Sequence, residues 1–138
     1  MKLTPLLQLA GLLHLGLLCA GATMPHAVHA RRHLALLPPF LRRLFWVYYT
    51  FIAMTLIGFG TLTFLFASRM AAGEPVARAL CALLAVFWTA RLGVAAFVFD
   101  VRPYLTNWFY RAGNHAINLI FVYLVAVYFW TACNGGAL

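Results

Sequence analysis

Residues 75–99 read PVARALCALLAVFWTARLGVAAFVF, a stretch in which Arg78 lies near the start and Arg91 is the one charged residue of the interior. About 20 apolar residues, at about 1.5 Å of rise per residue, are enough for an α-helix to cross the roughly 30 Å hydrocarbon core of a membrane. Because lipid offers the backbone no hydrogen-bond partner, an unbroken helix is the conformation that suits such a stretch. Residues 75–99 therefore predict a transmembrane helix.

Three other stretches have the same apolar character and contain no Lys, Arg, Asp or Glu: residues 5–24, 44–67 and 114–133. Of the 138 residues, 65% are hydrophobic and only 9% are charged, which is too few to cover a water-soluble surface. Short connections place consecutive helices antiparallel. The sequence therefore predicts an all-α polytopic membrane protein, with a single domain over residues 1–138 that forms an antiparallel four-transmembrane-helix bundle.

The first apolar stretch has two features of a secretory signal, because Lys2 precedes it and Val28-His29-Ala30 is similar to a cleavage site. Signal cores are typically about 7–15 residues long, and this run is longer. We therefore expect an uncleaved helix.

Basic residues are divided unequally between the two sides of the predicted membrane. Six lie in the first and third loops and three on the other side: Arg31, Arg32, Arg42, Arg43, Arg102 and Arg111 against Lys2, Arg69 and Arg78. Short loops rich in arginine and lysine stay in the cytoplasm. The asymmetry predicts that the first and third loops are cytoplasmic and that both termini lie on the opposite side.

The net charge of +8 also indicates what the loops bind. An arginine close to an anionic membrane surface gains about 1 kcal/mol. The basic residues are split among loops, and the sequence has no recognised nucleic-acid-binding motif, so nucleic acid is not expected. We expect membrane lipids with anionic headgroups as partners, together with another membrane protein or a second copy of the chain.

Small side chains recur every four residues in the third predicted helix, at Cys81, Ala85, Thr89 and Gly93. A ridge of small residues lets two helix backbones approach closely in lipid. The spacing predicts that this ridge is a helix contact.

Six polar side chains lie in or beside the third loop: Arg91, Asp100, Arg102, Asn107, Asn114 and His115. An arginine inside a membrane costs about 3 kcal/mol or more and is usually paired or lines a cavity. Asp100 is about 13.5 Å further along the helix axis and about half a turn round, so we do not expect it to pair with Arg91. Arg102 and Arg111 are closer to Asp100 in the sequence and are the candidates for an ion pair with it.

The third loop has two interpretations. In the first, Pro103 begins a short interfacial helix whose apolar face lies in the headgroup plane, with Tyr104, Leu105, Trp108 and Phe109 on that face. In the second, the polar residues around the loop form a site that holds a lipid headgroup, with arginine for the phosphate and Asp or His for proton transfer.

Histidine spacing raises two further hypotheses. His26, His29 and His33 fall at i, i+3 and i+7, one face of a helix, which is a weak candidate for a metal site because the adjacent arginines repel cations. His14 and His115 are the histidines within predicted spans, but their depths differ too much for a shared haem. We therefore predict neither a metal ion nor a cofactor.

Catalytic patterns are not evident, since no paired carboxylates, activated nucleophile, phosphate loop or metalloprotease helix can be identified. The interiors of the spans contain no acid for proton-coupled export. We expect an accessory, scaffold or assembly component without catalysis of its own. The alternative is a lipid-headgroup-binding protein or a small lipid-handling enzyme with its site at the cytoplasmic interface.

The segments LRRLFWVYYTF (residues 41–51) and VFDVRPYLTNW (residues 98–108) resemble stretches of short, uncharacterised bacterial four-helix membrane proteins. The resemblance implies a bacterial membrane protein with four helices. Together with the asymmetry of basic residues, it predicts a location in the bacterial inner membrane with both termini in the periplasm. It implies no activity, and no site residue is transferred from it.

Overall fold

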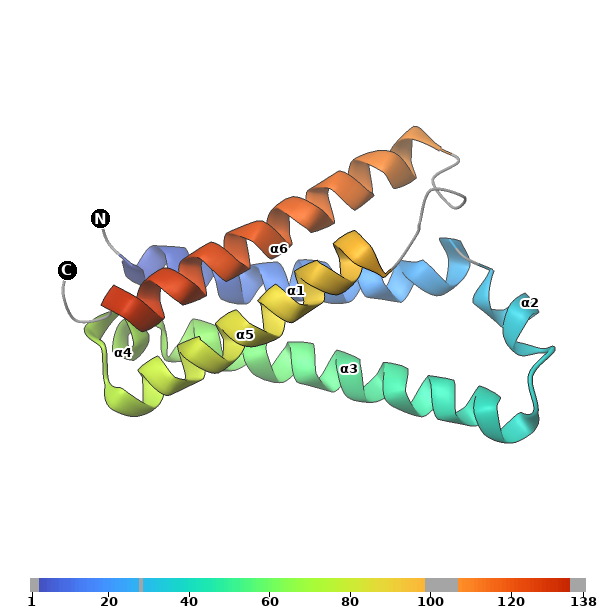
Figure 1. Ribbon diagram of the computed structural model, residues 1–138, viewed down its shortest axis with the longest axis horizontal. Coiled ribbons are helices and arrows are strands. Elements are labelled where there is room, and N and C mark those ends of the chain that lie inside the picture. The colour runs from blue at the N-terminus through green and yellow to red at the C-terminus, as the bar shows by residue number, and fades with distance from the viewer. Residues whose placement is uncertain (1–2, 28, 99–106, 135–138) are drawn as a thin grey trace.

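The computed structural model of the chain describes residues 3–27, 29–98 and 107–134 (Figure 1). Within these ranges the chain is helical apart from turns and contains no strand. The helices are α1 (Leu3–Ala27), α2 (Ala30–Leu34), α3 (Pro39–Leu65), α4 (Ala67–Ala72), α5 (Pro75–Phe97) and α6 (Trp108–Asn134).

Four of these helices, α1, α3, α5 and α6, are long and apolar enough to cross a membrane. The prediction of an all-helical chain with four helices able to span a membrane is therefore confirmed. The helix ends follow local chemistry: α3 and α5 both have proline in their first turn, where its missing N–H is not needed. Gly73 ends α4 with a φ of 79°, a left-handed conformation that glycine adopts without strain.

The boundaries of α6 differ from the predicted ones. The sequence predicted a span from residue 114, but α6 begins at Trp108, and Trp108 and Phe109 form its exposed first turn. These two residues therefore do not belong to a separate interfacial helix. The predicted start of that helix at Pro103 lies outside the described residues, as do Asp100 and Arg102.

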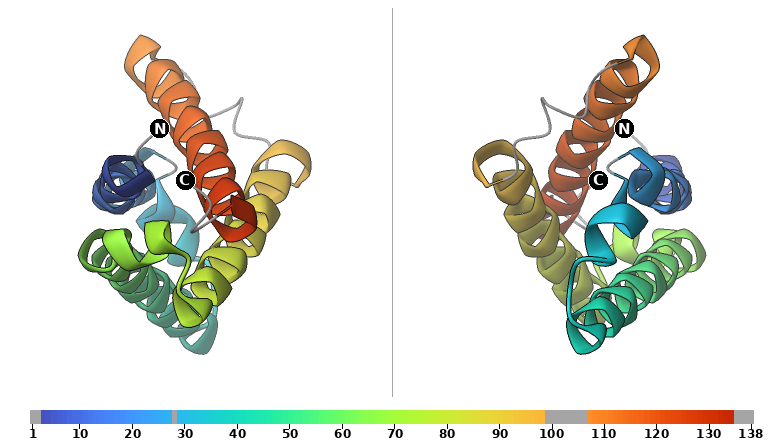
Figure 2. Two further views of the ribbon diagram at one scale, coloured as in Figure 1. Left: turned by 90° about the vertical axis from the view of Figure 1, so that its left-hand side faces the viewer. Right: turned by 90° about the vertical axis from the view of Figure 1, so that its right-hand side faces the viewer.

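The long helices pack as two pairs, α1 along α3 and α5 along α6, and α1 also contacts α6 (Figures 1 and 2). The short helix α4 packs across α1. α1 begins and α6 ends at the same end of the molecule, beside α4 (Figure 1). From there the helices spread apart toward the end that carries α2 and the start of α6.

Burial follows this spread. Most buried residues of the long helices lie in the halves near α4, for example Leu7 on α1, Leu84 on α5 and Leu124 on α6, each with no exposed surface. In α3 the buried residues are Gly60 and Thr63, close to its C-terminal end. The core of the protein is therefore concentrated at the α4 end.

The backbones of α1 and α3 approach closely at Gly11 and Gly60. A Cβ atom on Gly60 would lie 2.8 Å from the Cβ of His14, and one on Gly11 would lie 2.8 Å from the carbonyl oxygen of Gly60. Only glycine fits at these distances, so this pair sets the separation between α1 and α3.

Candidate functional site

A polar cluster lies in the interior, with one side chain from each long helix. Trp88 Nε1 donates a hydrogen bond to Nε2 of His14 over 3.2 Å. The other ring nitrogen of His14, Nδ1, lies 2.7 Å from the carbonyl oxygen of Ala10, to which it donates. The hydroxyls of Thr63 and Tyr128 are 2.6 Å apart. We call His14, Thr63, Trp88 and Tyr128 the central polar cluster.

Aromatic contacts extend the central polar cluster toward Arg91. The His14 ring meets Trp88 edge-on, with centroids 5.2 Å apart, and meets Tyr128 edge-on at 6.2 Å. Trp88 stacks on Phe121 at 5.5 Å, and the guanidinium carbon of Arg91 lies 5.5 Å from the centroid of the same Phe121 ring. The partly buried Arg91 therefore makes a cation–π contact with α6.

The buried polar side chains have hydrogen-bond partners. No buried side-chain nitrogen or oxygen among the described residues lacks a hydrogen-bond partner. A polar group without a hydrogen-bond partner costs several kcal/mol in hydrocarbon. Each interhelical hydrogen bond contributes roughly 0.6 kcal/mol to stability on average, and up to about 1.7. These bonds therefore favour one arrangement of the four helices over others. The central polar cluster therefore acts as a structural connection between helices.

The residues predicted to form a site around the third loop are only partly described. Arg91 is partly buried on α5, Asn114 is partly buried on α6 and His115 is exposed on α6. Asp100 and Arg102 lie outside the described residues. Asn107, directly before α6, is exposed. A polar cluster that unites these six residues therefore stays a prediction.

The predicted ridge of small residues on α5 divides in two. Cys81 and Ala85 are buried, whereas Thr89 is exposed. At Gly93, a Cβ atom would meet nothing within 4 Å, so this glycine is not at a tight crossing. The tight crossing is at Gly11 and Gly60, which the sequence analysis did not single out.

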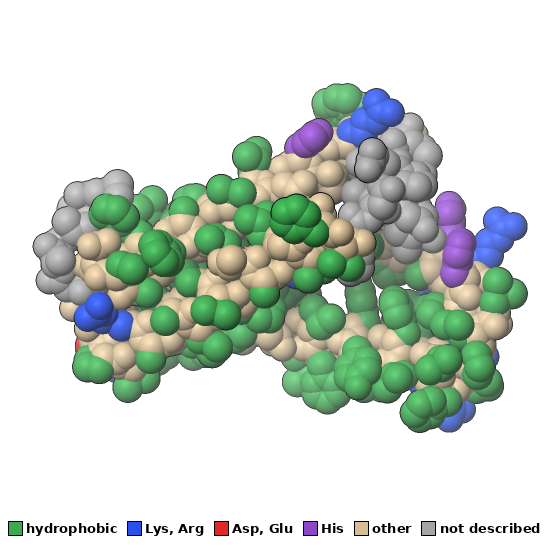
Figure 3. All heavy atoms as spheres, viewed as in Figure 1, with side chains coloured by type: hydrophobic (Ala, Val, Ile, Leu, Met, Phe, Trp, Pro, Cys, Tyr) green, Lys and Arg blue, Asp and Glu red, His purple; other side chains and the backbone are tan. Residues whose placement is uncertain are grey.

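A pocket of about 450 Å³ opens at the opposite end of the molecule from α4. We call it the α1–α2–α3 pocket, because its walls come from the end of α1, from α2 with the preceding turn, and from the start of α3. Its lining residues are Ala22, Pro25, His26, His29, Arg31, Arg32, Trp46 and Tyr49. Figure 3 shows histidine and basic side chains gathered at this end.

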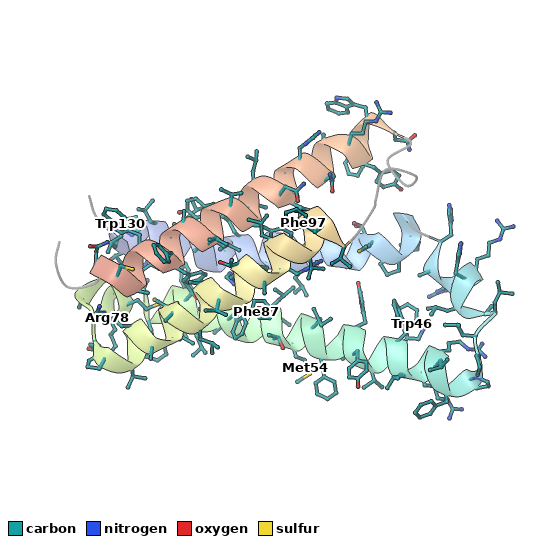
Figure 4. All side chains as sticks on the ribbon, in the orientation of Figure 1. Trp46, Met54, Arg78, Phe87, Phe97 and Trp130 are labelled. Carbon is teal, nitrogen blue, oxygen red and sulfur yellow. The ribbon has the colours of Figure 1, made fainter. Side chains whose placement is uncertain are left out.

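The walls of the pocket are held by specific contacts. The hydroxyl of Tyr49 donates a hydrogen bond to the carbonyl of Gly21, which ties α3 to α1. The ring of Trp46 (labelled in Figure 4) packs edge-on against Tyr49, with centroids 5.8 Å apart. His29 has a φ of 52°, the left-handed conformation that is uncommon for residues other than glycine. This turn directs α2 away from the line of α1.

Arginines at the two ends of the molecule differ in their contacts. At the α4 end, Arg78 donates two hydrogen bonds to the carbonyl of Ala132, at 2.9 and 3.2 Å, and Arg69 lies over the ring of Phe66. In the α1–α2–α3 pocket, the guanidinium groups of Arg31 and Arg32 make no hydrogen bond, ion pair or ring contact within the described part of the chain.

Two of the three histidines considered as metal ligands, His26 and His29, line the pocket. His33 is exposed and is not among the lining residues. Across residues 3–27, 29–98 and 107–134 there is no group of three His, Cys, Asp or Glu side chains placed to hold a metal ion.

Comparison with known proteins adds no relative: no family profile, curated protein or solved structure matches this chain. The fold is that of an all-helical chain with four helices that are long and apolar enough to cross a membrane.

Proposed function

We propose that the protein is an accessory or assembly component of a membrane, which works by binding and has no catalysis of its own. The observation that carries this proposal is the central polar cluster. Its four side chains have between 0% and 2% exposed surface and bond to each other or to the backbone. These groups stabilise the fold, which leaves binding to the surface of the protein.

Alternative membrane functions require features that the cluster does not supply. A transport path needs polar groups that can exchange protein contacts for a hydrated substrate, and a catalytic site needs a reactive group that a substrate can reach. Both ring nitrogens of His14 are already bonded, and the hydroxyls of Thr63 and Tyr128 bond each other. The cluster thus supports a packing role better than either alternative.

The surface of α3 is the part of the fold that we propose meets another protein or a second copy of the chain. Only 11% of its most apolar 18-residue stretch is buried, compared with 33% for α1 and 28% for α6. The exposed side chains there are large, and include Tyr48, Phe51 and Ile52. Aromatic and aliphatic side chains of this size give the contact area that interhelical packing needs in lipid.

Photo-crosslinking in native membranes tests this proposal. We expect p-benzoylphenylalanine at position 51 of α3 to give one discrete protein adduct. The same group at position 83 of α5 is the control, since Phe51 and Leu83 are 59% and 58% exposed. Adducts with lipid alone at both positions would contradict an accessory role for α3. The mass of the adduct distinguishes a second copy from a different protein.

We also propose an antiparallel bundle in a bacterial inner membrane, with the α2 end in the cytoplasm and both termini in the periplasm. This orientation is supported by Arg31, Arg32, Arg42 and Arg43, which belong to the α2 end.

Cysteine labelling checks the orientation. In a chain whose native cysteines are replaced, Ser68→Cys on α4 is expected to react with a membrane-impermeant maleimide in cells whose outer membrane is permeabilised. Arg42→Cys on α3 is expected to react only after the inner membrane is disrupted. Labelling of Arg42→Cys before disruption would reverse or abolish the proposed orientation.

A further inference from the structure

We propose that the α1–α2–α3 pocket binds a phosphate-bearing anion, with Arg31 and Arg32 as its ligands. The pocket has about 450 Å³ of space, within the range of about 300–1,000 Å³ that is typical of small-molecule sites. This is more than a phosphate group alone requires, so a larger molecule that carries a phosphate fits.

The charge of the lining favours an anion. Two arginines and two histidines contribute to the pocket, and no carboxylate does so among the described residues. Of the two acids in the chain, Glu74 lies between α4 and α5 at the other end, and Asp100 lies outside the described residues. The guanidinium group presents several N–H donors in a plane, a geometry that matches the oxygens of phosphate.

The guanidinium groups of Arg31 and Arg32 are available to bind an anion. Arg69 and Arg78 are engaged with Phe66 and Ala132, respectively, at the α4 end. No such contact occupies Arg31 or Arg32 in the part of the chain that the structure describes. An anion in the pocket therefore would not need to displace an existing partner of either group.

The aromatic wall indicates where the ligand comes from. Trp46 and Tyr49 lie in the first half of α3, a helix long and apolar enough to cross a membrane, and rings of this kind concentrate at the level of the lipid headgroups. We therefore infer that the pocket lies at the level of the phosphates of a bilayer. A phosphate group is common to an anionic lipid and to a soluble organic phosphate, and the experiment below separates these two sources.

The backbone around the pocket is also unusual. His29 holds a left-handed conformation without being glycine or having a side-chain capping bond. Such residues occur often at ligand sites, where the surrounding structure maintains the strain. Here the conformation places α2, and with it both arginines, beside the aromatic wall of α3.

Binding can be measured by isothermal titration calorimetry of the full-length protein in zwitterionic detergent. The probes are dioctanoyl phosphatidylglycerol, dioctanoyl phosphatidylcholine and glycerol 3-phosphate. We expect saturable binding of the anionic lipid with one site per chain, and at least about tenfold weaker binding in the double variant Arg31→Gln/Arg32→Gln. If glycerol 3-phosphate binds as tightly as the lipid, the pocket binds a soluble organic phosphate. If only the lipid binds, the pocket binds a lipid headgroup.

The matched control is Arg42→Gln/Arg43→Gln. It removes the same charge from the same end of the molecule, at exposed residues that do not line the pocket. We expect this control to bind the anionic lipid within about threefold of the unsubstituted chain, because general attraction falls equally in both double variants. Equal losses in the two variants, equal affinity for phosphatidylcholine, or no saturable binding would each overturn the proposal. Unchanged thermal unfolding shows that both variants keep the fold.

Discussion

Gly60→Ala is expected to lower the free energy of unfolding by about 1–3 kcal/mol, the range for a side chain forced into a filled interior. The new methyl group would lie 2.8 Å from the Cβ of His14 and 3.0 Å from the carbonyl oxygen of Gly11. Neither neighbour is the flexible end of a side chain, so α1 and α3 must move apart. The same movement would shift His14 relative to Trp88, which extends the effect to α5.

Gly58→Ala is the control for this substitution. It lies on the same helix, and its added Cβ would meet nothing within 4 Å. Alanine is favoured over glycine inside a helix by up to about 1 kcal/mol, so the control should be as stable as the unsubstituted chain or more stable. The free energy of unfolding of each variant is measured by titrating sodium dodecyl sulfate into mild-detergent micelles and following tryptophan fluorescence. Equal stability of the two variants would show that α1 and α3 do not cross at Gly60.

Trp88→Ala is the second substitution with a large expected effect, a loss of about 3 kcal/mol, at the low end of the range for tryptophan in a core. The low end applies because lipid, rather than water, surrounds the separated helices. The Trp88 side chain contacts His14 by a hydrogen bond and Phe121 by ring stacking, and only 2% of its surface is exposed. Its removal leaves a cavity and leaves Nε2 of His14 without a donor.

Two companion variants separate these contributions. Trp88→Phe keeps a ring but removes the N–H, and it should cost about 1 kcal/mol, near the value of an interhelical hydrogen bond in lipid. Trp130→Ala removes a tryptophan that is 46% exposed on α6, and it should have a much smaller effect than Trp88→Ala. The same titration measures all three variants, and similar losses for Trp88→Ala and Trp130→Ala would contradict a structural role for the central polar cluster.

The four spans were predictable because the property that defines them is local. An apolar stretch of sufficient length without acids or bases is visible in the sequence, as in residues 75–99, and the hydrocarbon core fixes the number of residues that a helix needs. The start of α6 at Trp108 was missed because an aromatic residue near a span is compatible with either an interfacial helix or the first turn of the span itself.

Contacts between the helices depend on the rotation of each helix about its axis, which the sequence does not specify. His14 was recognised only as a weak haem ligand, although its bonding partner is Trp88 on another helix. A histidine near the middle of one span, with tryptophan, tyrosine and threonine in the others, was the available signal for such a cluster. Helix-packing glycines were equally ambiguous: Gly11 and Gly60 are in contact, while Gly93 is not.

The α1–α2–α3 pocket could not be predicted from the sequence, for a different reason. The sequence indicated a basic loop at Arg31 and Arg32, where the structure has α2, and anionic lipid was expected near them. The pocket itself depends on one backbone conformation, at His29, which sets the direction of α2. Non-glycine residues enter the left-handed region too rarely for the sequence to predict this turn.

The concentration of buried residues near α4 gives the molecule unequal stiffness across the bilayer. Leu84 and Leu124 have no exposed surface, so their amide hydrogens should exchange with solvent far more slowly than those of the first turns of α3. With the orientation that we propose, we expect the helix spacing to be fixed at the α4 end, in one leaflet, and adjustable at the α2 end, in the other. Lipid composition in that second leaflet is therefore the variable to which the shape of the protein should respond.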